Sequence, residues 1–348
     1  MKITHIIFSF ITGGAETMLI DIVNEQVKKA EVKIIIINKI YNKELINKIN
    51  ENVIVHFINR HPHSKNPLSI VRLNRLLYQL KSDIIHCHNH NIICLLLPSF
   101  KNRSVLTVHD TGIKSNNFKF YNKLFAISNS VKMDIEKRTG LKTILIYNGI
   151  AIDKIRSKEK NDIKENFKIV VVSRLRHLKK GQHLVIEALY LLKKQGVTNI
   201  IVDFIGVEII KGESENYLRN LVQEYNLSNN IFFLGYRDRD FVYANLCDYN
   251  LLIQPSLFEG FGLTVAEGIA ARIPVLVSNI EGPIEIIDYG QHGYWFQSGD
   301  PEQLANQIMF IYNSYGTLGL KQKISSAYLH VKNNFNIITT SKNYLDNY

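Results

Sequence analysis

The sequence predicts an α/β protein with two doubly wound parallel sheets, one in each half of the chain. The 348 residues are too many for one ordinary core and fit two domains of about 170 residues. Short apolar segments rich in β-branched residues alternate with amphipathic segments of helical length, first in residues 1–150 and again after residue 166. This alternation is typical of parallel sheets covered by helices on both faces.

The first half contains seven segments that we expect to be strands. They are Ile3–Ser9, Val32–Ile37, Val53–Ile58, Asp83–His86, Val105–Val108, Leu124–Ala126 and Thr143–Ile146. Ala15–Lys29 carries apolar residues at helical spacing, and Asn129–Thr139 follows Ser128, a suitable helix N-cap.

The second half repeats the pattern after a polar, charged segment, 151–166, which we interpret as a linker. Expected strands are Lys168–Val172, Ile200–Ile205, Ile231–Leu234, Tyr249–Gln254 and Pro274–Ser278, and expected helices are Gln182–Lys194, Ser214–Tyr225, Asp240–Leu246 and Leu263–Ala271. The chain then turns helical at Pro301–Tyr312 and Leu318–Asn333. The predicted domains are therefore 1–150 and 167–315, followed by C-terminal helices in 316–348 that could pack back on the first domain.

The net charge of +11 comes from the first half alone. Residues 1–150 hold 21 Lys and Arg against 10 Asp and Glu, whereas residues 151–348 hold 21 of each kind. This asymmetry indicates an anionic partner, such as lipid headgroups, nucleic acid or an acidic substrate, or else ordinary solvated faces in a Lys-rich chain. The first half contains no recognisable nucleic-acid-binding motif, so we do not expect nucleic acid as a partner.

The cysteine content and the N-terminal segment also indicate in which cellular compartment we expect the protein. Cys87, Cys94 and Cys247 form neither a disulfide framework nor a metal-binding spacing, which favours a reducing cytoplasm. The N-terminal segment reads as a first strand and not as a signal peptide, and no apolar run approaches the roughly 18–20 residues that span a bilayer.

The segment 255–267 carries the most specific chemical pattern. It follows an expected strand and opens a helix, and its Gly260 and Gly262 permit a close approach of the backbone to a ligand. The free amides at the helix start predict an anion site. Glu259 and Glu267 can accept hydrogen bonds from hydroxyl groups, whereas the alternative is a capped helix with two solvated acids.

A second segment, 173–181, links the first strand of the second half to its helix. Arg174 and Lys180 stand at its two ends and could hold a diphosphate, Arg through its planar fork and Lys as a compact charge. A basic surface turn is the alternative. Lys179 is the other candidate, and we choose Lys180 because it adjoins Gly181.

Two weaker patterns lie in the first half. Gly13 and Gly14 follow the first strand without forming a complete dinucleotide fingerprint. His86, His88 and His90 raise a zinc hypothesis, but the last of them is expected to leave the strand, so we predict no metal site. His109 at a strand end is more suited to hydrogen bonding with substrate oxygens.

Taken together, GGAE, VHD, YNGI, SRLRHLKKGQ and EGFGLTVAE resemble the retaining family 4 glycosyltransferases, also called glycosyl transferases group 1. The resemblance covers nearly the whole chain in the family's order. It implies the GT-B fold, two Rossmann-like domains facing across a cleft, and an enzyme that moves a sugar from a nucleotide diphosphate sugar to an acceptor hydroxyl. The first domain would bind the acceptor and the second the donor. UDP-sugars are the favoured donors, and no cofactor or metal is expected.

The resemblance also implies residue roles. Arg174 and Lys180 would bind the diphosphate, Glu259 the donor sugar and Glu267 the ribose. The remaining implied contacts are Gly14 at the phosphate or acceptor, His109 as a donor to the sugar, and the amides of Phe261, Gly262 and Leu263 along the sugar and phosphate. We expect Thr264 to bind the donor as well, and Tyr236, after the strand Ile231–Leu234, to lie near the base.

The acceptor expected for such an enzyme is a glycan or lipid-linked sugar of bacterial surface polysaccharide synthesis. The basic first half fits peripheral contact with anionic lipid at the inner face of the cell membrane, through Lys101–Arg103 and Lys114–Lys123 with Phe118, Phe120 and Tyr121. Alternatives are a sugar-nucleotide epimerase or phosphorylase of the same shape, or a two-lobed sugar-binding protein without turnover.

Overall fold

The computed structural model describes residues 1–11, 13–62, 64, 66–160, 162–163, 165–208 and 213–348. Residue 12, just before the GGAE motif, and residues 161 and 164 of the predicted linker lie outside these ranges. The chain divides into two compact units. The first unit comprises residues 1–151 and 335–348, and the second unit residues 152–334. The predicted segment 316–348 is thereby divided between the two.

The first unit is built on a seven-stranded sheet in the order β3-β2-β1-β4-β5-β6-β7, with every pairing parallel. Its strands are β1 (Lys2–Ile7), β2 (Glu31–Asn38), β3 (Ile54–Arg60), β4 (Ile84–Cys87), β5 (Ser104–Val108), β6 (Lys123–Ala126) and β7 (Ile144–Leu145). The strand order reverses between β1 and β4. In doubly wound sheets, ligands bind outside the carboxyl ends of the strands at such a reversal.

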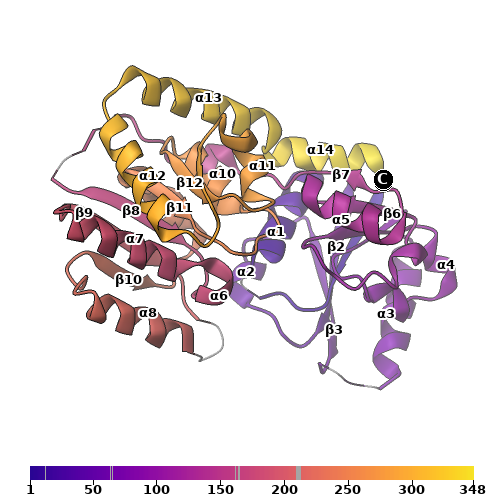
Figure 1. Cartoon of the computed structure of the whole chain (residues 1–348). Coiled ribbons are helices and arrows are strands. Elements are labelled where there is room, and N and C mark those ends of the chain that lie inside the picture. The colour runs from indigo at the N-terminus through magenta and orange to yellow at the C-terminus, as the bar shows by residue number, and fades with distance from the viewer. Residues whose placement is uncertain (12, 63, 65, 161, 164, 209–212) are drawn as a thin grey trace. The chain divides into compact units, whose positions relative to one another are not determined.

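Helices pack around these strands, and all but one of them lie between consecutive strands in the chain (Figure 1). They are α1 (Gly14–Gln26), α2 (Lys43–Ile46), α3 (Leu68–Leu80), α4 (Pro98–Lys101), α5 (Asn129–Thr139) and, from the end of the chain, α14 (Ile337–Asn347). Short 3₁₀ turns lie at η1 (Ile92–Leu95), η2 (Phe118–Phe120) and η3 (Ile152–Lys154), the last in the second unit. As expected, the Ser128 side chain caps α5, by accepting from the Val131 N–H.

The second unit holds a six-stranded parallel sheet in the order β10-β9-β8-β11-β12-β13. Its strands are β8 (Phe167–Val172), β9 (Ile200–Ile205), β10 (Ile231–Gly235), β11 (Leu251–Gln254), β12 (Val275–Ser278) and β13 (Tyr294–Phe296). Its helices are α6 (His177–Lys180), α7 (Gln182–Lys194), α8 (Glu213–Glu224), α9 (Arg239–Asn245), α10 (Leu263–Ala270), α11 (Pro283–Ile286), α12 (Pro301–Ser314) and α13 (Leu318–Asn334), with 3₁₀ turns η4 (Leu246–Asp248) and η5 (Asp288–Gly290). Every predicted strand is present. The strand β13 and the helices α2, α3, α4, α6, α11 and α14 were not predicted individually.

Successive side chains of a strand point to opposite faces of the sheet, so the second unit has core residues on both faces. Phe167, Ile169 and Val171 belong to one large cluster with α7, α8 and α12. On the other face, α10 lies so close to the sheet that a Cβ at Gly268 would stand 3.0 Å from the Leu252 side chain. This packing fixes where α10 begins, and α10 begins at the loop that carries Glu259.

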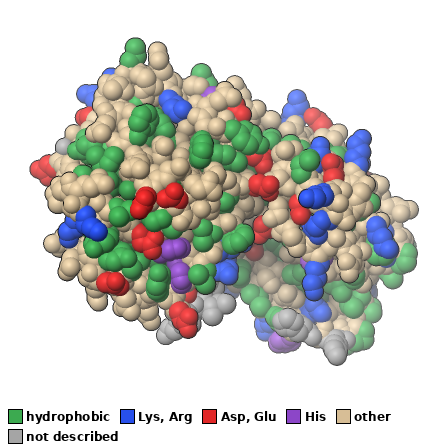
Figure 2. Space-filling view, viewed as in Figure 1, with side chains coloured by type: hydrophobic (Ala, Val, Ile, Leu, Met, Phe, Trp, Pro, Cys, Tyr) green, Lys and Arg blue, Asp and Glu red, His purple; other side chains and the backbone are tan. Residues whose placement is uncertain are grey.

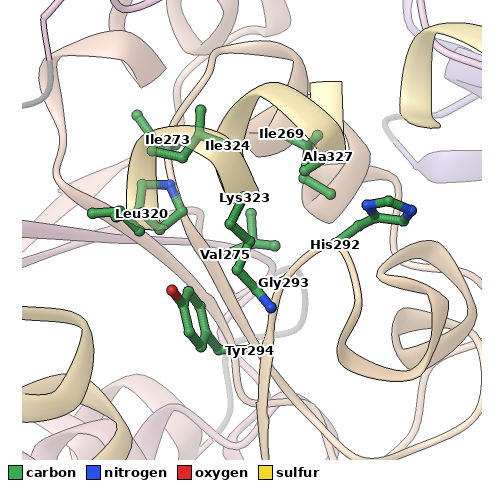
Figure 3. A pocket seen from close by; sticks show the side chains of 11 residues that line it. Ile269, Ile273, Val275, His292, Gly293, Tyr294, Leu320, Lys323, Ile324 and Ala327 are labelled. Atoms are coloured by element: carbon green, nitrogen blue, oxygen red, sulfur yellow. The ribbon is translucent and has the colours of Figure 1, made fainter. Parts of the chain in front are cut away.

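A small cavity lies between α10, the strands β12 and β13, and α13 (Figure 3). Its volume of about 10 Å³ has room for roughly one water molecule. The Lys323 ammonium donates to the Gly290 carbonyl at 2.8 Å and lies 4.9 Å from the centre of the Tyr294 ring. Burial lowers the pKa of Lys323. The cavity is too small for a substrate. It lies where α13 packs against α10 and the end of the sheet.

The last helix, α14, is part of the first unit and packs beside α1. Ile150 pairs with Asn336 as it enters, and the Thr340 hydroxyl donates to the Tyr147 carbonyl at 2.8 Å. The chain can come this close because Gly149 has no side chain. A Cβ there would lie 2.7 Å from backbone atoms of Asn336 and Ile337.

We therefore predict that Gly149→Ala destabilises the protein by about 1–3 kcal/mol, because the added methyl group displaces the start of α14. Thermal unfolding measures the loss. Gly319→Ala is the matched control, since a Cβ there meets nothing within 4 Å. Equal melting temperatures for the two variants would contradict this account of how α14 is seated.

Candidate active site

The turn after β8 has a fixed backbone and an exposed cationic side chain. Gln182, fully buried at the start of α7, donates from Nε2 to the Ser173 hydroxyl at 2.9 Å and to the Arg174 carbonyl at 2.8 Å. The Arg174 side chain itself is exposed. The strand end therefore presents a guanidinium from a rigid base.

This turn is locked to the loop that follows β11. Gly181 ends α6 with φ +67°, and a Cβ there would lie 1.8 Å from the Pro255 carbonyl oxygen, so only glycine fits. The N–H groups of Leu257 and Phe258 donate to the Lys179 carbonyl at 2.9 and 3.2 Å. The two motifs singled out in the sequence thus form one structural element, which we call the locked loop pair (residues 173–181 and 255–262).

An ion pair joins the side chains of the locked loop pair. Lys180 Nζ lies 2.5 Å from Glu259 Oε2, and the two side chains are 17% and 19% exposed. Gln254 Nε2 reaches the same carboxylate oxygen at 3.2 Å, and its Oε1 accepts from the Thr264 hydroxyl at 2.7 Å. The sequence-based roles gave Lys180 and Glu259 separate substrate groups, whereas here they contact each other.

The pair has a chemical consequence. An ammonium has three N–H donors, so Lys180 can keep Glu259 and still donate to a phosphate oxygen. The carboxylate fixes where the positive charge stands. Of the two lysines left open by the sequence, Lys180 has the side chain on Glu259, and Lys179 supplies the backbone carbonyl that holds the loop.

The glycine-rich part of the loop leads into α10. Gly262 stands at the N-cap position with φ +98°, where a glycine has no side chain with which to cap the helix. Phe261 is buried, and a Cβ at Gly282 would lie 3.0 Å from the Gly260 carbonyl, so the loop is packed tightly from the β12 side. The first amides of α10, beginning at Leu263, form a site suited to a negatively charged group.

Glu267, one turn into α10, is 7% exposed and held by α9. Tyr243 donates its hydroxyl to Glu267 Oε1 at 3.2 Å, and Arg239 Nε lies 3.7 Å from the same oxygen. The Arg239 guanidinium also stands 4.7 Å from the centre of the Tyr243 ring. Sequence reasoning missed both partners. Their spacing of four residues is typical of one helix face, but it does not show what that face meets.

Tyr236 follows β10 and is 46% exposed. The strand ends beside it are close together, because Gly206 donates its N–H to the Gly235 carbonyl at 2.9 Å. A Cβ at Gly206 would lie 2.0 Å from the Ser173 carbonyl oxygen. The carboxyl ends of β8, β9 and β10 therefore meet, and Tyr236 stands at the same edge of the sheet as Arg174.

In the first unit, Gly14 and His109 lie at the carboxyl edge of the sheet. Gly14 is the first residue of α1, after β1, and His109 directly follows β5. One strand, β4, separates β1 from β5.

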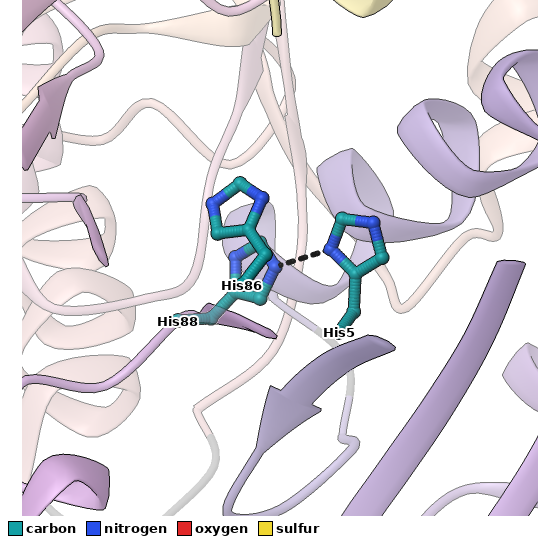
Figure 4. Close-up of side chains that lie close together, drawn as sticks. All are labelled: His5, His86 and His88. Carbon is teal, nitrogen blue, oxygen red and sulfur yellow. Dashed lines mark hydrogen bonds between the residues drawn. The ribbon is translucent and has the colours of Figure 1, made fainter. Parts of the chain in front are cut away.

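Three buried histidines lie near His109. The nearest nitrogens of His5, His86 and His88 are all within 4.8 Å of one another (Figure 4). The sequence had grouped 86, 88 and 90, but His5 from β1 takes the third place because β1 pairs with β4, a contact distant in sequence. Burial lowers the pKa of His5 to about 4 and those of His86 and His88 well below the usual value.

All ring nitrogens of this cluster already have hydrogen-bond partners. His5 contacts His88 and Gln26, His86 contacts Tyr348 and Thr107, and His88 contacts His109 in addition to His5. A metal ion would have to break these bonds.

Two family models match the chain. "Glycosyltransferase Family 4" matches residues 12–154, and "Glycosyl transferases group 1" matches residues 153–327. The junction between them falls within three residues of the boundary between the two units.

Individual proteins agree with these matches. The O-antigen biosynthesis glycosyltransferase WclY of Escherichia coli is 25% identical over 345 residues, covering 94% of this chain and 93% of its own. The putative colanic acid biosynthesis glycosyltransferase WcaL of Salmonella typhimurium is 31% identical over 40% of this chain and 34% of its own.

A crystal structure of HepE from Anabaena in complex with UDP superposes with a TM-score of 0.84, at 21% identity over 100% of this chain and 99% of that one. The two parallel-sheet α/β units are thus those of the GT-B fold. This chain belongs to the glycosyl transferases group 1 family and is a glycosyltransferase.

Proposed function

We propose that this enzyme transfers a sugar from a UDP-sugar to a hydroxyl group of a glycan, with retention of the anomeric configuration. The observation that carries the proposal is the locked loop pair. It places Lys180, Glu259 and the start of α10 on one rigid element, and Arg174 lies on the same turn as Lys180. Fixed cations beside the N-terminal amides of a helix suit a diphosphate.

In the reaction, the bond between the anomeric carbon and the β-phosphate oxygen breaks, and the electron pair leaves with the diphosphate. The acceptor oxygen bonds to the anomeric carbon on the same face, and its proton passes to the departing phosphate oxygen. The products are a glycoside and UDP. The protein's task is to stabilise the charge that develops on the leaving group.

Magnitudes decide which groups matter most. Removing one well-aimed electrostatic group costs roughly 10²–10³ in rate. A helix terminus contributes only about 0.3–2 kcal/mol. Arg174 and Lys180 therefore dominate, and the amides of Phe261, Gly262 and Leu263 add to them. In this scheme the cations do the work that a metal ion does in other transferases, and the enzyme needs no resident cofactor.

The relatives support the donor and acceptor classes. HepE has been crystallised with UDP and with UDP-glucose, and WclY and WcaL are named for O-antigen and colanic acid biosynthesis. We assign the acceptor to lipid-linked glycans of a bacterial surface polysaccharide. His109 and Gly14 are assigned to the sugar and to the phosphate or acceptor, and Glu267 and Tyr236 to the nucleoside.

A surface of the first unit supports work at the inner face of the cell membrane. The exposed side of α3 carries Leu68, Val71, Arg72, Arg75 and Tyr78, with Val71 60% and Tyr78 77% exposed. In Figure 2, Lys and Arg side chains spread over the part of the molecule that holds α3, α4 and α5. Apolar and aromatic groups mixed with cations are typical of contact with anionic lipid.

The surface continues beyond α3. Asn74 bonds to both Leu95 and Leu97, which brings the exposed Leu97 beside the helix, and Lys101 stands 4.9 Å from the exposed Phe120 ring. The expectation that Phe118 and Tyr121 contact lipid is wrong, because both are buried in the core. Every helix in the described ranges is too short or too polar to cross a bilayer.

Arg174→Ala and Lys180→Met should each weaken UDP binding at least tenfold and lower kcat with saturating UDP-sugar by about 10²–10³, because each removes a cation from the leaving group. Calorimetric titration with UDP and turnover assays measure the two effects. Arg176→Ala, an exposed arginine of the same turn, is the matched control. Near-normal turnover of Arg174→Ala would contradict the proposed role.

Membrane contact predicts that the double variant Arg72→Gln, Arg75→Gln binds vesicles containing anionic lipid about thirtyfold more weakly, since each basic residue near such a surface contributes about 1 kcal/mol. Sedimentation with phosphatidylserine vesicles measures it. The control Lys321→Gln, Lys332→Gln removes the same charge from exposed positions of α13 in the second unit. Equal losses, or binding indifferent to anionic lipid, would count against the proposal.

A further inference from the structure

The buried histidines form a row that ends at His109. Gln26 Oε1 lies 2.8 Å from His5 Nε2, His5 Nδ1 lies 3.1 Å from His88 Nε2, and His88 Nδ1 lies 3.3 Å from His109 Nε2. We call Gln26, His5, His88 and His109 the histidine relay. All four lie in the first unit, and Gln26, His5 and His88 are almost fully buried.

Each bond of the relay has one direction. The Gln26 amide nitrogen donates to the Tyr348 hydroxyl at 3.1 Å, so its oxygen is the acceptor for His5, and His5 Nε2 carries the hydrogen. A neutral imidazole carries one N–H, so His5 Nδ1 accepts from His88 Nε2. By the same step, His88 Nδ1 accepts from His109 Nε2.

The side branch is consistent with this order. The Tyr348 hydroxyl accepts from Gln26 and so has its own hydrogen for His86 Nδ1, 2.6 Å away. His86 Nε2 then donates to the Thr107 hydroxyl at 2.7 Å. Each of these hydrogen bonds therefore has one donor hydrogen. Burial supports neutral rings throughout, since it also lowers the pKa of His109 to about 4, against a smaller opposing effect of Asp110.

We propose that the histidine relay holds His109 as the Nε2–H tautomer, so that its Nδ1 is a hydrogen-bond acceptor for a hydroxyl group of the substrate. This rests on the proposed function, in which His109 meets the sugar. It reverses the role that the family resemblance implied, where His109 donates. Gln26, His5 and His88 are positioning residues, and they act through His109.

The acceptor state selects a substrate class. A hydroxyl group can donate to Nδ1, whereas a carboxylate only accepts and a methyl group does neither. An unpaired polar group in a closed site costs binding. The relay therefore favours donors with a hydroxyl at the position that meets His109, and it disfavours uronates and deoxysugars there.

The direct test is long-range ¹H–¹⁵N correlation of the histidine rings in the whole protein, with His109 assigned by its loss in His109→Gln. The protonated and bare nitrogens of a neutral imidazole have well-separated shifts. We expect His109 to show protonated Nε2 and bare Nδ1 at pH 7. A protonated Nδ1, or both nitrogens protonated, would overturn the proposal.

Two variants at His88 distinguish an effect on the His109 tautomer from an effect on packing alone. His88→Asn can offer an oxygen near the place of Nδ1 and should retain the tautomer, whereas His88→Phe removes the acceptor and should release it. Relative to His88→Asn, His88→Phe should lower kcat/KM about tenfold and reduce the preference for UDP-glucose over UDP-glucuronate. Equal tautomers in the two variants would show a structural role only and would overturn the proposal.

The spectrum also distinguishes this proposal from the proposed function. The tautomer is measured without turnover. An Nε2–H tautomer in a protein that does not bind UDP would refute the donor assignment and leave the direction of the relay intact. UDP binding with an Nδ1–H tautomer would refute the relay alone.

Discussion

The close contact between Gly181 and Pro255 is the constraint on which the proposed donor site depends. With no room for a Cβ at Gly181, the turn after β8 and the loop after β11 lie backbone against backbone, and the Lys179 carbonyl receives two N–H groups from that loop. The pairing of Lys180 with Glu259 follows from this contact, since neither side chain reaches the other unless the two segments are held together. In the proposed role, this partly buried charge pair would also face the diphosphate, which trades some stability for a preset charge position.

The first unit shows a different way of fixing chemistry. There, neutral side chains set the orientation of one another through hydrogen bonds. Tyr344 of α14 and Tyr348, which follows this helix, supply part of that hydrogen-bond network. Since β1, β4, α1 and α14 all contribute, the arrangement depends on the fold of the entire unit. Tyr348 is therefore linked through Gln26 to the row of histidines that ends at His109, although it lies far from them in sequence.

Much of this architecture could be predicted because it is local. Apolar runs gave the strands, and Gly262 with the following apolar helix gave the start of α10. The partners of the site residues could not be predicted, because they depend on tertiary packing. His5 takes the place of His90 because the sheet order sets β1 beside β4. Arg239 and Tyr243 reach Glu267 through the packing of α9 on α10, and Gln254 reaches Glu259 and Thr264 through the course of the loop after β11. The division of residues 316–348 between the units has the same origin, since α13 packs against α10 of the second unit and α14 against α1 of the first.

The central claim is that Lys180 and Glu259 act as one unit in holding the diphosphate. A double-mutant cycle on the dissociation constant of UDP, with Lys180→Met, Glu259→Gln and the double variant, tests it most directly. Residues that share one network show coupling of about 0.5–3 kcal/mol, whereas independent residues add to within about 0.5 kcal/mol. The account predicts coupling of at least about 1 kcal/mol. Additive effects of the two substitutions would contradict it.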